Sequence, residues 1–290
     1  MNNTIVITGA AGQLGSHVAH ALIEAHKAKN TGSTLRFASR DVLKIAALKD
    51  AGHETVFADF NDAESLMHAF TGANVALIIS GDAPNAVRIE QHKRAIDAAK
   101  AAGVTRVVYT SFANPTLSSK FTFAAIHHET EAYLKASGMA YTIVRNNSYA
   151  GNLDHAIAGA RESGVLVGYG AQGKVAYITH ANLGEAIAIA LLDEAHANKT
   201  YELSGEQAYD HADVAALLSK AGKVVTVSEP TAQQAADELT GFGLPEFLVQ
   251  AIVSMGDAVN AGEYAATSTD FATLTGHKPT TLAEYLQVVA

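Results

Sequence analysis

Three glycines near the start of the chain, Gly9, Gly12 and Gly15, are spaced three residues apart and follow an apolar run at residues 5–7. Leucine, valine and alanine then recur at helical spacing, so the pattern predicts a strand, a tight turn and a helix. In such a turn the backbone can approach a phosphate closely, and the free N–H groups of the helix attract its charge. A tight turn without a ligand is the alternative. The residues expected to hold a dinucleotide here are Thr8, Gly9, Ala10, Ala11, Gly12, Gln13, Leu14 and Gly15.

A second strand, expected at residues 34–40, ends in Ser39 and Arg40. In a dinucleotide-binding sheet an acidic residue at this point binds the ribose hydroxyls of NAD, whereas an arginine accepts the 2′-phosphate of NADP. Arg40 can bind that phosphate with two N–H groups, and the Ser39 hydroxyl can add a hydrogen bond. Asp41 follows, but its side chain is expected on the other face. The sequence therefore predicts NADP(H) as the cofactor, unless Arg40 is only a surface residue that opens the next helix.

The glycine turn is the first step in a series of alternating strands and helices. Apolar runs at residues 34–40, 53–59, 75–81, 106–111 and 140–145 are separated by segments of helical periodicity. This alternation favours right-handed crossovers and an α/β fold, the Rossmann doubly wound parallel sheet. Because the carboxyl ends of parallel strands meet at one edge, further cofactor contacts are expected from Asp59, Phe60, Ile79, Ser80, Gly81 and Ser111.

After residue 150 the alternation loosens, and no Pro-rich or Ser-rich linker marks a boundary. We expect residues 1–150 to form the NADP(H)-binding Rossmann domain. Residues 151–290 are expected to form a smaller α+β C-terminal lobe on the substrate side, packed against the carboxyl edge of the sheet. The predicted elements of this lobe are strands at 164–167, 175–178, 200–203 and 224–227 and helices at 183–192, 214–220 and 244–261.

The composition excludes several classes of function. The 290 residues contain no cysteine, which excludes disulfides, thiolate metal sites and a cysteine nucleophile. Residues 1–150 carry 14 Lys and Arg against 12 Asp and Glu, a net charge of +2, whereas residues 151–290 carry 6 against 17, a net charge of −11. The first half suits an anionic cofactor, and the acidic second half, most simply a solvated surface, argues against nucleic-acid binding. With no signal peptide or membrane-spanning stretch visible, we expect a cytoplasmic protein without a membrane partner.

Several further motifs accompany the glycine turn: Ser39-Arg40, Asp59-Phe60, His127-x-x-Thr130-Glu131 and a stretch from Tyr141 to Tyr149 that contains Arg145-Asn146. Together they resemble the NmrA-like atypical short-chain dehydrogenases, and within them the type-2 NAD(P)H:quinone oxidoreductases and triphenylmethane-dye reductases. The resemblance runs nearly end to end. It implies an NADPH-binding fold, hydride transfer to quinone-like or cationic aromatic acceptors, and a pocket beside Asn146 and Tyr149. The chain departs from these relatives at His180 and Asn182, where they often carry Arg and Asp.

Ordinary short-chain dehydrogenases protonate a carbonyl with a Tyr-x-x-x-Lys pair, and none of the ten tyrosines here has a lysine four residues on. Phe123 and His127 occupy the corresponding positions of the matching helix, and phenylalanine cannot donate a proton. Quinones and carbocations tolerate this loss because their reduced forms are already stabilised. His127 is a candidate catalytic residue that binds the nicotinamide ribose in place of lysine, with a helix-surface histidine as the alternative. A His-Glu-x-x-His zinc motif would need histidine at Ala132, so no metal is expected.

Candidate substrate-binding residues follow the ends of the fifth and sixth strands. They are Phe112, Asn146 and Tyr149, and Phe121 would extend the same wall. Aromatic walls suit a planar acceptor stacked on nicotinamide. Three residues of the lobe are further candidates, although core packing explains them more simply: Phe242, Phe247 and Met255.

These observations predict an NADPH-dependent reductase that transfers hydride to a quinone-like or cationic aromatic acceptor. Its expected partner is a small aromatic or quinone substrate, and the sequence allows a homodimer. An NADP(H)-sensing regulatory protein of the NmrA type, with little turnover, is the alternative, and the missing tyrosine is consistent with both. A sugar-nucleotide epimerase shares this fold but normally needs the Tyr/Lys pair.

Overall fold

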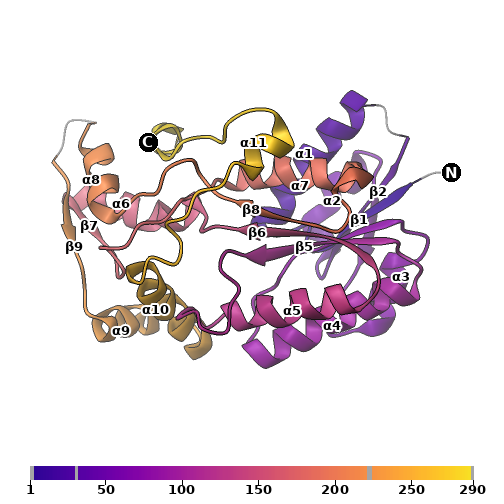
Figure 1. Cartoon of the computed structure of the whole chain (residues 1–290), viewed down its shortest axis with the longest axis horizontal. Helices are drawn as coiled ribbons and strands as arrows, with labels where there is room; N and C mark the ends of the chain where they lie inside the picture. Colours follow the sequence, from indigo (N-terminus) through magenta and orange to yellow (C-terminus); the bar gives the residue numbers. More distant parts are fainter. Residues whose placement is uncertain (1–2, 30–31, 221–223, 289–290) are drawn as a thin grey trace.

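A seven-stranded parallel sheet forms the centre of the protein in a computed structural model, which describes residues 3–29, 32–220 and 224–288 (Figure 1). The strand order is β3-β2-β1-β4-β5-β6-β8, and every neighbouring pair is parallel. The chain moves outward from β1 to β3 on one side and from β4 to β8 on the other. The crevice at this switch point opens at the carboxyl ends of β1 and β4, where such sheets bind ligands. The strands are β1 (Thr4–Ile7), β2 (Thr34–Ser39), β3 (Glu54–Phe57), β4 (Val75–Ile78), β5 (Arg106–Phe112), β6 (Ala140–Asn146) and β8 (Lys199–Leu203).

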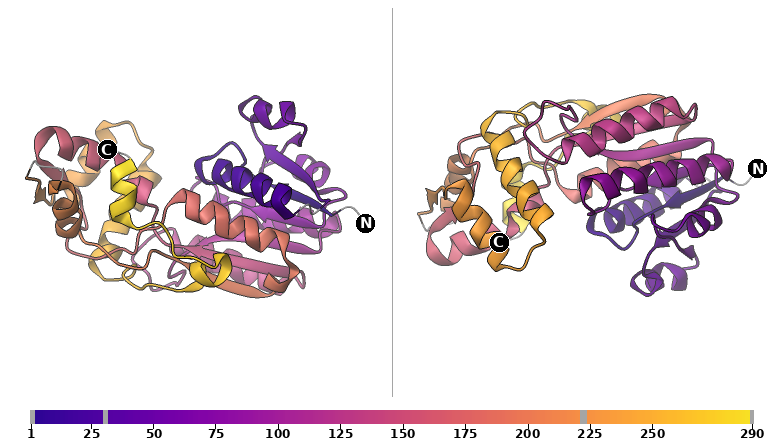
Figure 2. Two further views of the ribbon diagram at one scale, coloured as in Figure 1. Left: turned by 90° about the horizontal axis from the view of Figure 1, so that it is seen from above. Right: turned by 90° about the horizontal axis from the view of Figure 1, so that it is seen from below.

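Helices cover both faces of the sheet, as the views from above and below show (Figure 2). On one face lie α1 (Gln13–Lys29), α7 (His180–Leu192) and the short α11 (Asp270–Thr275); on the other lie α3 (Ala63–Phe70), α4 (Asn85–Ala101) and α5 (Ala124–Ala136). Each face has its own apolar core, and α7 is buried along most of its length because α1 and α11 both pack on it. After β2 the chain forms a 3₁₀ turn, η1 (Val42–Ile45), and α2 (Ala46–Asp50).

The α/β class, the parallel sheet and its first six strands are confirmed. The strand ends differ from the predicted ones by one to three residues, because the polar residues at several predicted ends belong to the loops that follow. Asp59, Ser80 and Gly81, for example, lie beyond β3 and β4. The helix after β3 begins at the predicted cap, where the Asp62 carboxylate accepts hydrogen bonds from the backbone N–H groups of Glu64 and Ser65.

A smaller lobe lies beside the carboxyl edge of the sheet and has an apolar core of its own (Figure 1). Its two strands, β7 and β9, pair in parallel with each other and not with the large sheet. The elements beyond β6 that complete the chain are η2 (Ala150–Leu153), α6 (Asp154–Ser163), β7 (Val165–Val167), η3 (Glu194–His196), α8 (His211–Ser219), β9 (Thr226–Ser228), α9 (Ala232–Gly241), α10 (Glu246–Asn260) and α12 (Leu282–Val288).

Three predictions for residues 151–290 are corrected by the topology. The strand at 200–203 and the helix at 183–192 belong to the large sheet and its cover, since β8 pairs with β6 and α7 packs on α1. The expected boundary after residue 150 therefore does not coincide with the edge of the sheet. Residues 175–178 form no strand; they make only isolated bridges, Val175 to Tyr209 and Ile178 to Tyr149. Strand pairing at this sequence separation is decided by packing, which a local apolar run cannot reveal.

Candidate active site

The glycine turn joins β1 to α1 at the switch point of the sheet. The hydroxyl of Thr8 donates to the carbonyl of Leu77 at 2.8 Å and accepts from the N–H of Ile79 at 3.2 Å, which ties the turn to the end of β4. Gly9 has a φ of +67°, in the left-handed region that side chains disfavour. A Cβ at Gly15 would overlap the carbonyl oxygen of Gly9, so α1 begins directly against the turn. The start of α1 consequently faces the crevice with its N–H groups and without an acidic side chain in its first turn.

A cavity of about 500 Å³ opens between this turn and the ends of β2 and β3. Ser39, Arg40, Asp59 and Phe60 all line it, as does Lys44 on η1. The structure thus gathers two cations, Arg40 and Lys44, at the end of β2. The position of Lys44, four residues after Arg40, is a sequence signal that could have indicated this second cation.

Asp41 lies in the same cavity, although strand alternation predicts the other face for its side chain. Its carboxylate caps η1 by accepting from the N–H of Leu43 at 3.1 Å, and its own N–H donates to the Ser39 hydroxyl oxygen at 3.0 Å. The turn after β2 redirects the side chain, so the alternation no longer applies. One oxygen of the Asp41 carboxylate therefore accepts a hydrogen bond from the backbone. Among the described residues, no ion pair joins Asp41 to Arg40.

A larger cavity of about 880 Å³ continues from the smaller one beyond the carboxyl ends of β4, β5 and β6. The two cavities share wall residues at the turn and after β4, including Gly9, Gly12, Ile79, Ser80 and Gly81, so they form one continuous crevice. Its length runs from Arg40 at one end to the small lobe at the other. The helix α10 closes the far side, contributing Met255 among other apolar residues.

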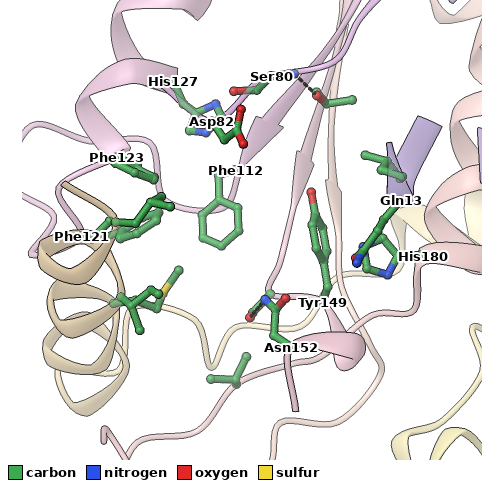
Figure 3. A pocket seen from close by; sticks show the side chains of 18 of the residues that line it. Gln13, Ser80, Asp82, Phe112, Phe121, Phe123, His127, Tyr149, Asn152 and His180 are labelled. Atoms are coloured by element: carbon green, nitrogen blue, oxygen red, sulfur yellow. Dashed lines mark hydrogen bonds between the residues drawn. The ribbon is translucent and has the colours of Figure 1, made fainter. Parts of the chain in front are cut away.

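Aromatic side chains line one side of the larger cavity. Figure 3 shows Phe112, Phe121 and Phe123 on one wall and Tyr149 across the open space, with Gln13 and His180 beside it. The rings of Phe112 and Phe121 are tilted at a centroid distance of 5.3 Å, and those of Tyr149 and His180 lie 4.5 Å apart. Aromatic walls of this kind are typical of pockets that bind planar aromatic molecules.

His127 lies in this cavity and is buried, not on the helix surface. The Thr130 hydroxyl donates to the carbonyl of Ile126, so Nδ1 of His92 must donate to Thr130 at 2.9 Å. The Tyr109 hydroxyl then donates to Nδ1 of His127 at 2.9 Å. The proton of His127 is consequently on Nε2, for which no hydrogen-bond partner occurs in the described part of the chain.

The His127 ring is neutral over the whole physiological range. Burial, together with the positive charge of Arg88, lowers the pKa of His127 to about 3. Burial also raises the pKa of Tyr109. The pair therefore presents a fixed, uncharged N–H donor to the cavity, and neither group exchanges a proton readily at neutral pH.

The remaining residues of the His127-x-x-Thr130-Glu131 motif hold the wall together. Glu131 accepts from the Ser111 hydroxyl at 2.7 Å and from two N–H groups of Arg145 at 2.7 and 2.8 Å. Burial opposes the charge of this carboxylate, but the hydrogen bonds from Arg145 and Ser111 lower its pKa on balance. Ser111 is thereby fixed at the end of β5, where it lines the cavity.

The structure brings most of the sequence-predicted residues to the crevice. Four of the predicted residues do not line it. Ala10 is buried beneath the turn, and Asn146 is fully buried behind the cavity wall. Phe242 is 60 % exposed, and its ring contacts that of His155. The ring of Phe247 contacts that of Phe123 but does not line the cavity. The predicted residues that line one or both cavities are Thr8, Gly9, Ala11, Gly12, Gln13, Leu14, Gly15, Ser39, Arg40, Asp59, Phe60, Ile79, Ser80, Gly81, Ser111, Phe112, Phe121, His127, Tyr149 and Met255.

Sequence reasoning missed an important cation of the larger cavity, Arg88 on α4. Its guanidinium lies over the ring of Phe123 at 4.1 Å, and the side chain is only 4 % exposed. Arg88 belongs to no recognisable sequence motif, and the hydrophilic sequence of α4 resembles that of an exposed helix. Asp82 and Asn152 also line the cavity and were not predicted. Nothing in their local sequence distinguishes them from ordinary loop residues.

The sheet order, the glycine turn at the switch point and the crevice along the carboxyl edge together define a dinucleotide-binding α/β protein of the Rossmann type. The sequence matches the NmrA-like family over residues 1–286, and the chain belongs to this family.

Similar proteins of known activity span the whole chain. Quinone oxidoreductase 2 of Escherichia coli is 35 % identical over 97 % of this chain and 96 % of its own length. The NAD(P)H azoreductase of Xenophilus azovorans is 28 % identical over 99 % of this chain and 98 % of its own. A crystal structure of triphenylmethane reductase from Citrobacter sp. complexed with NADP(H) superimposes with a TM-score of 0.89 at 31 % identity, covering 99 % of this chain and 100 % of that one. The NADPH complex of the Escherichia coli quinone oxidoreductase superimposes with a TM-score of 0.90 at 34 % identity, covering 98 % of this chain and 99 % of that one.

Within the described residues, the helices include none that is both long and apolar enough to span a membrane. The same part of the chain contains no group of three or more His, Asp or Glu side chains arranged to hold a metal ion.

Proposed function

We propose that this protein is an NADPH-dependent oxidoreductase that reduces quinone-like acceptors by hydride transfer. The observation that carries the proposal is the continuous crevice, with a phosphate-binding turn in its middle, two cations at one end and an aromatic slot at the other. Relatives that cover the whole chain support it, since they are named as quinone oxidoreductase and NAD(P)H azoreductase and two are crystallised with NADP(H) or NADPH.

The residues of the crevice fit an NADP(H) molecule along its length. Arg40, Lys44 and Ser39 would bind the 2′-phosphate, and Asp59 and Phe60 would flank the adenine. The turn from Gly9 to Gly15 would hold the pyrophosphate on the start of α1, where a Cβ at Gly15 has no room. The nicotinamide would reach the larger cavity at the end of β5. When bound, NADPH supplies the hydride from C4 of this ring.

The side chains of the larger cavity position the acceptor and tune its electronics. Phe112 and Tyr149, on opposite walls, would hold a planar acceptor against the nicotinamide and exclude water. His127 would donate its Nε2–H to a ribose hydroxyl or to an acceptor oxygen, and its low pKa keeps it neutral while doing so. The position of the usual tyrosine is held by Phe123, so the proton needed after hydride transfer would come from solvent. A quinone suits this arrangement because its reduced anion is weakly basic.

Turnover of NADPH with a quinone tests this proposal. Purified protein is mixed with NADPH and menadione, a neutral naphthoquinone, and the nicotinamide absorbance band is followed against a blank without protein. We expect oxidation of NADPH that requires both protein and quinone. Tight NADPH binding without acceptor-dependent oxidation, over several quinones, would indicate an NADP(H)-sensing regulatory protein. Absence of binding to either nicotinamide coenzyme would refute both functions.

A further inference from the structure

Arg88 is a buried cation for which the described part of the chain supplies no carboxylate partner. Its Nε donates to the carbonyl of Ala83 at 3.0 Å, whereas its Nη2 is buried and has no hydrogen-bond partner among the described residues. Burying a guanidinium without a charged partner is energetically unfavourable. The position is unfavourable in a second way, because Arg88 lies in the first turns of α4, where the helix dipole disfavours positive charge.

The surroundings of Arg88 place its charge at the acceptor end of the crevice. The residue lines the larger cavity but not the smaller one, so it lies away from Arg40 and Lys44. Its guanidinium stacks on Phe123, one helical turn before His127 on α5. Burial lowers the pKa of Arg88 to about 10, although Tyr109 and Asp82 oppose the shift, so the group remains protonated at neutral pH. Asp82 is exposed, and water screens its charge.

We propose that Arg88 is the residue that selects acceptors by charge: its guanidinium stabilises the oxygen of a neutral quinone as that oxygen becomes an anion, and it disfavours cationic dyes. This inference rests on the proposed function and deepens it. Its basis is an unpaired buried cation on the wall where short-chain dehydrogenases carry a proton-donating tyrosine and this chain has Phe123.

The chemistry is balanced without further reactants. In the proposed step the C4–H bond of NADPH would break as that hydrogen, with its electron pair, forms a bond to the quinone. One C=O π pair would move onto oxygen, which gives NADP⁺ and a hydroquinone monoanion that later takes a proton from water. Arg88 keeps its own proton throughout and acts as a fixed charge beside the developing oxyanion. A triphenylmethyl cation begins the reaction with a positive charge, so the same guanidinium repels it in the ground state. The acidic surface of residues 151–290 would attract such dyes from a distance, but Arg88 acts at closer range inside the cavity.

Kinetics of Arg88→Met with two acceptors test the proposal. For menadione we expect kcat/KM to fall about 10- to 100-fold, the range for losing a hydrogen bond to a charged group. For malachite green, a triphenylmethyl cation, we expect KM to fall, because the repulsion is removed. The dissociation constant of NADPH should stay within twofold, roughly the scatter of a surface substitution. Arg88→Lys should retain the preference for the quinone, since it keeps the charge.

Lys93→Met is the matched control, because Lys93 is on the same helix and pairs with Glu90 at 3.0 Å outside the cavity. Lys93→Met removes the same charge and should leave kcat/KM for menadione and KM for malachite green unchanged. An equal loss of activity toward menadione and malachite green in Arg88→Met would overturn the proposal. A rise in the NADPH dissociation constant as large as the loss in kcat/KM would do so too, since Arg88 would then bind the cofactor.

A measurement on the unaltered protein keeps the proposal testable if Arg88→Met fails to fold. An acidic hydroxynaphthoquinone, which is an anion at neutral pH, mimics the charge of the reduced product. In high salt, which screens exposed charges, it should inhibit more strongly than a neutral naphthoquinone of the same size. Equal or weaker inhibition would overturn the role of Arg88. If wild-type protein oxidises no NADPH with any acceptor, the proposed function itself has failed, and the two failures remain distinguishable.

Discussion

The two ends of the crevice are built in different ways. The cofactor end, from Arg40 to the glycine turn, is formed by two short segments: residues 8–15 and residues 39–44. The acceptor end is formed by residues that are far apart in sequence, such as Arg88, His127, Tyr149 and Met255. The first end is polar and carries exposed cations, whereas the second has a buried cation that packs on the ring of Phe123. The cofactor end therefore depends on local geometry, and the acceptor end depends on packing.

The largest effect is expected at the turn itself. Gly15→Ala should destabilise the fold by about 1–3 kcal/mol and abolish tight NADPH binding, because the new methyl group overlaps the carbonyl oxygen of Gly9. Gly159→Ala is the matched control, since Gly159 lies within a helix of the lobe with open space around it. It should stabilise the protein by up to about 1 kcal/mol through helix propensity. Urea unfolding measures the stability of each variant, and NADPH titration measures its affinity for the cofactor. Equal stability and equal NADPH affinity of the two variants would contradict the close packing of the turn.

The buried His127 should contribute to the acid sensitivity of the protein, in addition to its neighbour His92, whose pKa is also lowered by burial. The pKa of His127 is about 3 in the folded state, against an ordinary value of 6.5 for an exposed histidine, so the unfolded chain binds the extra proton first. Stability is therefore fully present above about pH 6.5 and falls as the pH decreases toward 3, by about 1.4 kcal/mol per pH unit from this group. His127→Gln should lose that part of the slope in urea unfolding measured between about pH 6.5 and about pH 4.5.

Tyr109→Phe provides the control for this pH dependence. It removes the hydroxyl that donates to Nδ1 of His127 but keeps the histidine buried. It should lower stability by about 1–3 kcal/mol at every pH, the effect of leaving a buried acceptor unpaired. The slope against pH should remain. If His127→Gln keeps the full slope, the histidine is not the titrating group.

A smaller effect is expected at the cofactor end. Arg40→Ala should raise the KM for NADPH about tenfold, the lower part of the range for a charge-assisted hydrogen bond, because Arg40 is exposed. The KM for NADH should change little, since NADH has no 2′-phosphate. Lys49→Ala removes an exposed charge outside this cavity and should affect neither coenzyme. Equal changes for NADPH and NADH in Arg40→Ala would exclude a phosphate-binding role.

The smallest effect separates two phenylalanines that were both candidates for the acceptor pocket. Phe112→Ala should raise the KM for menadione by about 2- to 10-fold, the loss of one aromatic contact. Phe242→Ala should leave it unchanged, because this ring is 60 % exposed and outside the cavity. Steady-state kinetics at saturating NADPH compare them. A larger effect of Phe242 would mean that the lobe closes further onto the acceptor than this structure shows.

Local sequence was sufficient to predict the first six strands of the sheet, the glycine turn and the cation that follows β2. These depend on residues within a few positions of one another: the apolar run before Gly9, the spacing of three glycines, and Arg40 at a strand end. Strand and helix periodicity is a local property, so it can be recognised without knowledge of the rest of the chain.

Which side chains line the larger cavity became known only from the folded chain. Asn146 lies behind the wall, Asp41 turns into the crevice, Phe242 is at the surface and Arg88 lies on Phe123. The strand β8 likewise joins the large sheet across more than fifty residues from its partner β6. Contacts between distant segments depend on shape, on burial and on the pairing of charges inside a cavity, and none of these is written in the spacing of neighbouring residues.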